Sequence, residues 1–548
     1  MKLIKKIIYC SIFALAGIGL NSCDSFLQEY SQDLAKVNSW QDLDEVLLGS
    51  AYLKKGMYYN SGEYSTAMER DDHFDILHFM SDEIRMSDDK YQLFDYYNSM
   101  FAFFTWQQDT GVDNQIRYMG GDENYFNSPY SRINICNMVI SLIDDQPSSS
   151  VEDDIQKSRV KGEAYFLRGL YYFFLANLYC EPYNPSTAAQ TVGLPLKFSE
   201  VVEDTEFQRS SLAETYSKVL EDLMKAEECL ADVPHKSLYR ADVNAVRLLM
   251  SRVYLYMQDW DNAISKAKEV LQANDKLLRI SSKSIGQSCL DSSSPEIIFS
   301  MGDYMIAYYF QDSRLYRAAI HISDDMLDLY SDNDYRKERY IGSTENRSND
   351  IFMKVNGQRE TMGSYTTVGS TFCFRTPEAY FTLAEASAYK GDETTARQTM
   401  EKFLATRMEG DVTLSKSGNE LIDFIRDERA REFLLEGHRW FDLRRYSVCQ
   451  PYPWSKEIIH GYIYMSEDGW KTVHDHTDWY RLEKNDIAYT LPIPRTVRNF
   501  QTSLGNISRP VRKPFDTTQV HGSSYDNLDE EDEDDPGDED DDWGDDDW

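Results

Sequence analysis

The sequence predicts a mainly α-helical protein in which a tetratricopeptide-like helical-hairpin scaffold supports long irregular loop insertions. Hairpin patterns with small residues at the helix crossings recur along the chain. Strand-like runs are short and few, for example at 296–301 and 488–494, so no large sheet is expected. Less periodic stretches at 280–370 and 447–490 separate the hairpins, and insertions of this kind often carry binding functions.

The first predicted hairpin joins a helix at residues 160–179 to a helix at 212–230. Small residues, among them Gly162 and Gly169, lie between the aromatic residues of the first helix. Because a small residue lets a second backbone approach closely, we expect the two helices to pack tightly. A further helix is expected after residues 39–42, where Ser, Trp, Gln and Asp form a capping-box pattern.

Two later segments repeat the hairpin pattern. One pairs residues 245–257 with 263–271 across an acidic turn, and its second helix has Ala263 and Ala267 one turn apart. The other runs from 378 to 403 through a similar Gly-Asp turn. Small residues at helix crossings are typical of tetratricopeptide repeats. We therefore place the hairpins near 160–275 and 378–445, within one domain.

The most distinctive segment reads ERAREFLLEGHRWFDLRRY and covers residues 428–446. Apolar residues at helical spacing predict one amphipathic helix over 421–436. Gly437 is then expected to adopt a left-handed conformation or to allow a neighbouring backbone to approach. A second apolar cluster follows, made of Trp440, Phe441 and Leu443.

This segment allows two interpretations of its charged side chains. Carboxylates one helical turn apart can share a proton or hold a metal, so a catalytic site is one of them. Its residues would be Glu428, Glu432, Glu436 and His438. Alternating Arg and Glu at helical spacing more often form an ion-pair network. We favour the network.

Both ends of the chain carry processing or low-complexity signals. Lysines followed by an apolar run over residues 7–20 predict an export signal, residues 1–22. The sequence Leu20-Asn21-Ser22-Cys23 resembles a bacterial lipobox, which would make Cys23 a lipidation site; an ordinary signal peptide is the alternative. One domain then covers 23–525. Residues 526–548 form an acidic tail that we expect to be disordered, with calcium binding as a further hypothesis.

Charge and cysteine usage exclude several classes of protein. The chain has 57 basic and 93 acidic residues, a formal net charge of −36, which argues against a nucleic-acid partner. Its cysteines include no CxxC pair, so zinc ribbons and thioredoxin-like chemistry are not supported. Apart from Cys23 and one cysteine in the signal, we expect most to be buried thiols.

Eight motifs in a fixed order resemble the SusD/RagB family of outer-membrane lipoproteins from Bacteroidetes. They include CDSFLQEY after the lipobox, SRINICNMVI at 131–140, the helix at 160–179, RTPEAYFTLAEASAYKGD at 375–392, the segment at 428–446 and LPIPRTVRNF at 491–500. The resemblance implies a surface lipoprotein that binds an oligosaccharide, or in some relatives a peptide. It also implies a SusC-like TonB-dependent transporter as partner, an outer-membrane location through the lipid anchor, and no cofactor.

A glycan site needs aromatic faces that stack on sugar rings, flanked by polar groups that bond hydroxyls. Four aromatic insertions fit this need, at 91–97, 304–316, 454–464 and 470–480. Packing is the alternative role for each, and we assign Trp106 and Trp440 to the core. The candidate ligand-binding residues are Tyr91, Tyr96, Tyr97, Tyr304, Tyr308, Tyr309, Arg314, Trp454, Trp470 and Trp479.

Sequence motifs for catalysis are missing from the chain. It has no HExxH, no GxSxG and no glycine-rich phosphate or dinucleotide loop. His474 and His476 have the spacing of two metal ligands on a strand, but the sequence suggests no third ligand. We therefore expect a binding protein and not an enzyme. A surface glycoside hydrolase stays open as an alternative, because two carboxylates suffice for that chemistry.

Overall fold

The computed structural model describes residues 37–53, 74–86, 95–201, 205–302, 320–342, 351–352, 354–355, 368, 371–468 and 471–520. The predicted export signal, Cys23 and the acidic tail lie outside the described residues. The prediction of a mainly α-helical fold is confirmed, because helices dominate the described chain and its sheets are small. No described helix is both long enough and apolar enough to span a membrane.

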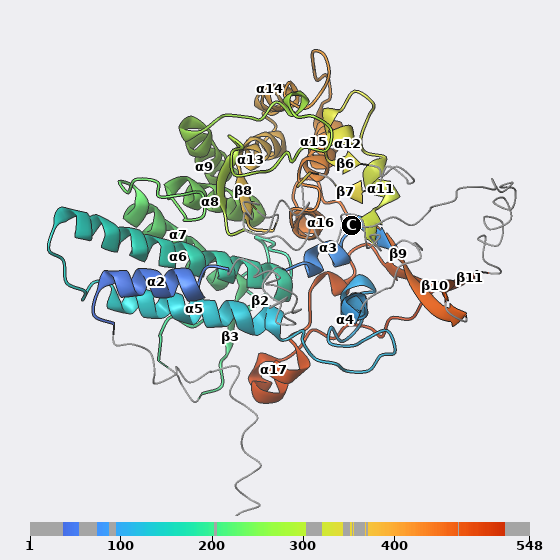
Figure 1. The fold of residues 1–548 in the computed structure, drawn as a ribbon, viewed down its shortest axis with the longest axis horizontal. Coiled ribbons are helices and arrows are strands. Elements are labelled where there is room, and N and C mark those ends of the chain that lie inside the picture. The colour runs from blue at the N-terminus through green and yellow to red at the C-terminus, as the bar shows by residue number, and fades with distance from the viewer. Residues whose placement is uncertain are drawn as a thin grey trace, which may run out of the picture.

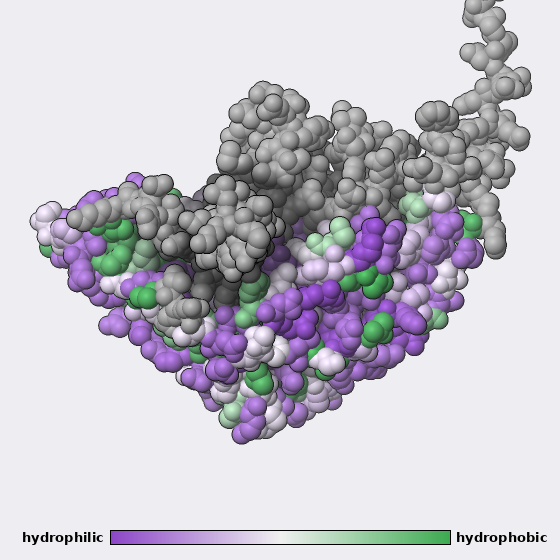
Figure 2. Space-filling model, turned by 90° about the horizontal axis from the view of Figure 1, so that it is seen from below, coloured by the Kyte–Doolittle hydropathy of each residue, from purple (hydrophilic) through white to green (hydrophobic). Residues whose placement is uncertain are grey.

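A frame of long helices forms one side of the molecule, and a strand ribbon projects from the other (Figure 1). Seen from below, the described surface is largely hydrophilic, with hydrophobic residues in small separate areas (Figure 2). The frame comprises α2 (Trp40–Ser50), α5 (Asn124–Leu142), α6 (Val151–Tyr179), α7 (Leu212–Leu230), α8 (Val243–Met257), α9 (Trp260–Ala273), α13 (Thr376–Tyr389) and α14 (Glu393–Leu404).

All three predicted hairpins are present. The first consists of α6 and α7, whose close approach depends on glycine: a Cβ atom at Gly162 would lie 2.6 Å from Cγ of Leu230. A Cβ atom added at Gly169 would likewise lie 3.2 Å from a methyl carbon of Leu223. The predicted capping box at the start of α2 is confirmed, since Ser39 and Asp42 bond each other's backbone amides.

The other two hairpins turn in the same way. In the turn from α8 to α9, Gln258 has φ +63° and Asp259 then caps α9 with its side chain. In the turn from α13 to α14, Gly391 has φ +82° and Asp392 caps α14. A left-handed residue ends one helix and an aspartate starts the next, so local sequence fixes both turns.

The other helices and the strands lie mainly beside this frame. The helices are α3 (Ile76–Met80), α4 (Asp95–Phe104), α11 (Asp324–Leu327), α12 (Tyr335–Arg339), α15 (Gly418–Glu432), α16 (Arg439–Val448) and α17 (Arg495–Phe500), with 3₁₀ turns at Ile280–Ser282, Ile487–Tyr489 and Thr502–Leu504.

The strands form one three-stranded antiparallel sheet and four two-stranded pairs. The three-stranded sheet has the order β11 (Asp516–Gln519), β10 (Lys471–Leu482), β9 (Ile458–Asp468). The pairs are β1 (Ile84–Met86) with β5 (Ile320–Ile322), β2 (Val192–Pro195) with β3 (Arg209–Ser211), β4 (Ile297–Ser300) with β8 (Cys373–Arg375), and β6 (Ile341–Gly342) with β7 (Ile351–Phe352).

Three expectations about local structure were wrong. The helix predicted over 421–436 ends at Glu432, because Leu435 and Gly437 both have positive φ values, +54° and +75°. Residues 488–494 begin in a 3₁₀ turn and form no strand, since two prolines there cannot donate ladder hydrogen bonds. The stretch at 447–490, expected to be irregular, contains the whole of the long ribbon of β9 and β10.

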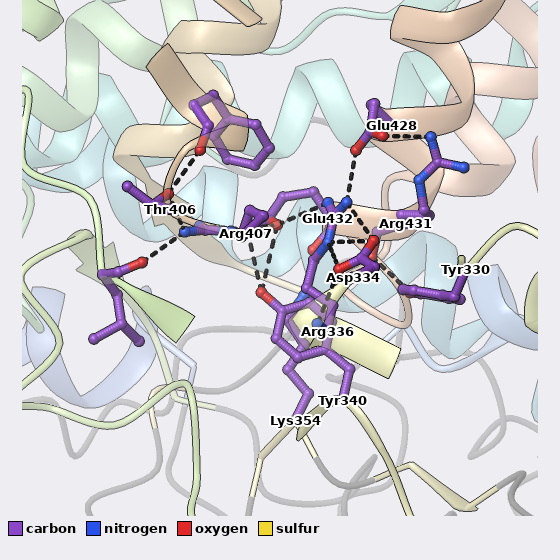
Figure 3. Close-up of polar contacts among 12 residues, drawn as sticks. Tyr330, Asp334, Arg336, Tyr340, Lys354, Thr406, Arg407, Glu428, Arg431 and Glu432 are labelled. Atoms are coloured by element: carbon purple, nitrogen blue, oxygen red, sulfur yellow. Dashed lines mark hydrogen bonds and ion pairs between the residues drawn. The ribbon is translucent and has the colours of Figure 1, made fainter. Parts of the chain in front are cut away.

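A buried ion network joins the frame to the helices and strands beside it (Figure 3). Glu432, at the end of α15, lies at its centre and is fully buried. Its carboxylate accepts hydrogen bonds from Arg407 at 2.9 Å and from Arg375 at 3.0 Å. The network balances five carboxylates with five cations, namely Glu296, Asp334, Glu428, Glu432 and Glu436 with Arg336, Lys354, Arg375, Arg407 and Arg431.

Equal numbers of charges make this arrangement tolerable in the core. Burying one unpaired ion costs several kcal/mol, so each charge needs a partner. The arginines hold the pKa of Glu432 and that of Glu428 below the ordinary range of a glutamate, against the opposing effect of burial. Glu428 and Glu432 therefore stay charged at neutral pH.

The remaining core is apolar and agrees with the sequence analysis. Trp106 and Trp440 are fully buried, as expected. The six cysteines in the described residues are unpaired, and all but Cys229 are buried, which confirms the expectation of mostly buried thiols.

Replacing Glu432 by Gln should lower the free energy of unfolding by about 3–5 kcal/mol, because Arg375 and Arg407 would be left buried without their shared carboxylate. Chemical unfolding of the two proteins measures the difference. A matched control is Asp332→Asn, which removes an exposed ion pair with Lys337 and should change stability little. Equal stability of wild type and Glu432→Gln would contradict the structural role of the network.

Stability should also fall in acid. The folded-state pKa values of Glu428 and Glu432 lie below the ordinary value of 4.5, so their stabilising contribution is complete above that pH. It is lost as the pH falls below 4.5 toward the folded-state values. Thermal unfolding midpoints between pH 7 and pH 3 measure the decline, and Glu432→Gln should show a shallower one. A midpoint constant down to pH 3 would argue against charged carboxylates.

Candidate functional site

The charged segment at 428–446 is closed to ligands. Glu428, Glu432 and Glu436 are each at most 3% exposed, and all three are engaged with cations. His438 is 5% exposed, and burial together with neighbouring arginines lowers its pKa well below 6.5. A general acid or base must reach its substrate, and these groups do not reach the surface. The ion-pair interpretation is therefore confirmed, although most partners come from other parts of the chain.

Two of the predicted aromatic insertions each have one end at the same place. The insertion that contains Tyr91 follows β1, and the insertion that contains Tyr304 precedes β5. These two strands pair antiparallel, and Met86 lies opposite Ile320. The last described residue before one insertion and the first described residue after the other are thus neighbours, although they are far apart in sequence.

The ribbon that carries the third and fourth insertions packs at the same place. Strand β9 contacts both β1 and α4. The ring of Phe101, in α4, meets that of Tyr462, in β9, edge to face at 4.9 Å, and the Tyr462 hydroxyl donates to Asn98 at 3.0 Å. We call the region formed by residues 81–86, α4, β5 and β9 the insertion edge.

Ion pairs fix the turn that precedes β1. The Asp82 carboxylate accepts two hydrogen bonds from Arg439, at 2.7 and 2.8 Å, and one from Lys456 at 2.7 Å. These cations hold the pKa of Asp82 well below its usual range, although burial opposes this. Glu83 accepts the backbone amide of Leu435 at 2.7 Å. The turn is thereby tied to α16 and to the loop that precedes the ribbon.

Most predicted ligand-binding side chains lie outside the described residues, namely Tyr91, Tyr304, Tyr308, Tyr309, Arg314 and Trp470. Tyr96 and Tyr97 fall in the first turn of α4, where the backbone is described and their side chains are not. The structure therefore locates the insertions by the strands and helices from which they depart.

Trp454 and Trp479 are described, and their surroundings differ. Trp454 is half-buried against α16, with its ring 6.3 Å from that of Tyr446. Trp479 lies within β10, and its six-membered ring covers Gly461 of β9, where an added Cβ would come within 2.9 Å of the ring. Its indole N–H donates to the Thr518 hydroxyl at 2.9 Å. Trp479 is thus a half-buried aromatic surface on the ribbon.

The histidine pair on β10 is not arranged like a metal site. The register of the ribbon shifts between His474 and His476, so the two do not share the regular alternation of a strand. His474 contacts the Thr477 hydroxyl at 2.9 Å, and His476 stacks on Tyr464 at 4.5 Å. Among the described residues, no group of three His, Cys, Asp or Glu side chains is placed to hold a metal ion.

Sequence reasoning missed the residues that build the insertion edge. Asp82, Arg439, Lys456 and His460 meet there from distant parts of the chain. Arg439 lies within the distinctive segment, but nothing in its spacing indicates a partner at Asp82. Only the tertiary structure brings these residues together.

Comparison with known proteins gives a consistent result. Residues 27–255 match a SusD-like family described as starch-binding associating with outer membrane, and residues 324–507 match the SusD family. Among proteins with curated descriptions, none matches the chain.

Solved structures with the same fold come from several Bacteroides species. A SusD-like carbohydrate binding protein from Bacteroides vulgatus is 19% identical with a TM-score of 0.62, and the match covers 86% of this chain and 98% of that one. A SusD superfamily protein from Bacteroides thetaiotaomicron is 18% identical with a TM-score of 0.61, and the match covers 85% of this chain and 99% of that one. A SusD superfamily protein from Bacteroides fragilis is 20% identical with a TM-score of 0.62, and the match again covers 85% of this chain and 99% of that one.

These likenesses show the fold over most of the chain, and the two family matches fall on its N-terminal and C-terminal parts in the expected order. The repeated hairpins, the distinctive charged segment and the matches to two models of one family agree. The chain belongs to the SusD/RagB family.

Proposed function

We propose that this protein captures oligosaccharides at the cell surface through the aromatic insertions and passes them to a SusC-like TonB-dependent transporter in the outer membrane. The observation that carries the proposal is the pairing of Met86 with Ile320, which places the start of one tyrosine-rich insertion beside the end of another. Family membership supports it, since one matching family is described as starch-binding and associated with the outer membrane.

The chemistry of the insertions suits a sugar. Tyrosine and tryptophan rings stack on the C–H faces of pyranose rings, while their hydroxyl and indole N–H groups can bond sugar hydroxyls. Tyr91, Tyr96 and Tyr97 from one insertion, with Tyr304 from the other, would supply such faces. Trp479 on the adjacent ribbon would extend the surface.

Binding without cleavage is part of the proposal. The clustered carboxylates Glu428, Glu432 and Glu436 are buried in ion pairs, as described above, and so cannot act on a bound glycan. Capture by a non-catalytic protein leaves the chain of sugars intact for import. Attachment through lipid at Cys23 would keep the protein beside its transporter.

Tyr91→Ala and Tyr304→Ala should each weaken binding of the recognised polysaccharide about fivefold to tenfold, because each removes one stacking face. Affinity electrophoresis in gels that contain a panel of polysaccharides measures the shift, and the double variant should bind still more weakly. The Phe198→Ala variant is the control, since Phe198 is 40% exposed but lies between β2 and β3.

Two results would overturn this proposal. Release of reducing ends by the wild-type protein would show a glycoside hydrolase. Retention of peptides with no polysaccharide shift would show that the insertions bind peptides instead.

Cys23→Ala should release the protein from membranes, because lipid chains attached at that cysteine would provide the anchor. Fractionation of cells that express the full chain measures this, with Cys10→Ala as the control within the predicted signal. A Cys23→Ala protein that stays in the membrane fraction would rule out lipidation at this residue.

A further inference from the structure

His460 occupies an unusual position at the insertion edge. It lies in β9 and is 3% exposed. Its ring is stacked between two aromatic rings, with centroids 4.2 Å from Phe104 and 4.4 Å from Trp106 and interplanar angles of 17° and 24°. Flat aromatic faces on both sides attract a cation more strongly than a neutral ring.

Both ring nitrogens face backbone carbonyl oxygens. Nδ1 lies 2.7 Å from the Phe104 oxygen, and Nε2 lies 2.9 Å from the Ser81 oxygen. A neutral imidazole has one N–H donor and one lone pair, whereas the imidazolium has two donors. A neutral ring here would point its lone pair at a carbonyl oxygen at hydrogen-bond distance, which is repulsive.

The charged groups near His460 pair with one another. Asp82 meets Arg439 and Lys456, and Lys456 also meets the exposed Asp325. Arg512, which donates to the Trp106 carbonyl, pairs with Asp486. His78 contacts Glu83 through Nδ1 at 3.2 Å. Tyr480, opposite His460 on β10, stays neutral because burial raises the pKa of its hydroxyl.

Burial acts in the opposite direction. Removal from water lowers the pKa of His460 and Lys456 lowers it further, while the two carbonyl oxygens and Asp82 favour the charged form. The hydrogen-bond geometry favours the charged form, because a neutral ring could relieve its repulsion only by moving away from one carbonyl. Both contacts have ordinary hydrogen-bond lengths, and two aromatic rings hold the imidazole between them.

We propose that His460 is held as an imidazolium in the folded protein, and that this buried proton fastens the β9 ribbon to the turn before β1 and to the end of α4. Ser81 begins the turn that leads into β1, after which the first aromatic insertion departs, and Phe104 ends α4. One protonated side chain thus joins three parts of the insertion edge. His460 is a positioning residue that touches no ligand.

The proposal fixes the sign of a pH effect. A histidine with a folded-state pKa above its ordinary value of 6.5 stabilises the fold fully below that pH. The contribution is lost as the pH rises through the folded-state value, when one of the two hydrogen bonds becomes a repulsive contact. A neutral buried His460 would give the opposite slope.

The test is a titration of the full chain labelled with ¹⁵N at its histidines. We expect one ring whose protons are shifted upfield by Phe104 and Trp106, whose two nitrogens both carry protons at pH 7, and whose midpoint lies above 6.5. That signal should be missing from His460→Gln. A ring with these shifts that is neutral at pH 7 and titrates near 4 would overturn the proposal.

Thermal unfolding gives a second, independent readout. The midpoint of wild type should exceed that of His460→Gln by about 2 °C more at pH 5.5 than at pH 8.5. His476→Gln is the control, because His476 lies on the same sheet but bonds the exposed Asp475. A difference independent of pH, or one that grows with rising pH, would contradict the proposal. If His460→Gln does not fold, the wild-type titration alone decides.

Discussion

The arrangement of the helices and strands beside the frame depends on the buried ion network around Glu432. Charged groups in a region of low dielectric must find opposite charges at hydrogen-bond distance, which leaves little freedom in the placement of the elements that carry them. Arg375 lies in β8, Arg407 follows α14 and Arg336 lies in α12. Each of these elements is therefore fixed relative to α15 more strictly than apolar packing alone would require.

The loop that follows α15 connects the ion network to the insertion edge. Glu436 belongs to the network through Lys354 and Arg375, while the amide of the adjacent Leu435 donates to Glu83 beside β1. Gly437 has no Cβ and packs against Leu77 of α3, where a side chain would be crowded. Leu435 and Glu436, which are adjacent in sequence, thus contact the insertion edge and the ion network respectively. The helical frame and the place from which the insertions depart form one connected unit.

The helical frame could be predicted from sequence because its signals are local. Ser39, Asp259 and Asp392 cap the helices that follow them, and small residues such as Gly162 mark the helix crossings. The family motifs, including the segment at 428–446, are local in the same sense, because each is a continuous stretch of sequence.

The candidate site was predicted only in part, because its geometry is not local. The aromatic composition of the insertions is visible in the sequence, but the proximity of the start of one to the end of another depends on the pairing of β1 with β5. The double stacking of His460 and its two carbonyl partners involve residues more than 300 positions away. No periodicity or spacing rule reports such contacts. For the same reason the sequence predicted an ion network in the distinctive segment but not its distant arginines.

The pairing of β1 with β5 also bears on the order in which the molecule assembles. A helical hairpin such as that of α8 and α9 needs only contacts between neighbours in sequence, and its turn is fixed by adjacent residues, so it can form early. Joining Ile84 to Ile322 requires closing a loop that contains most of the frame, which is entropically costly until the frame exists. The surface that we assign to ligand capture is therefore expected to be completed last during folding, and a chain with a damaged frame would lose it first.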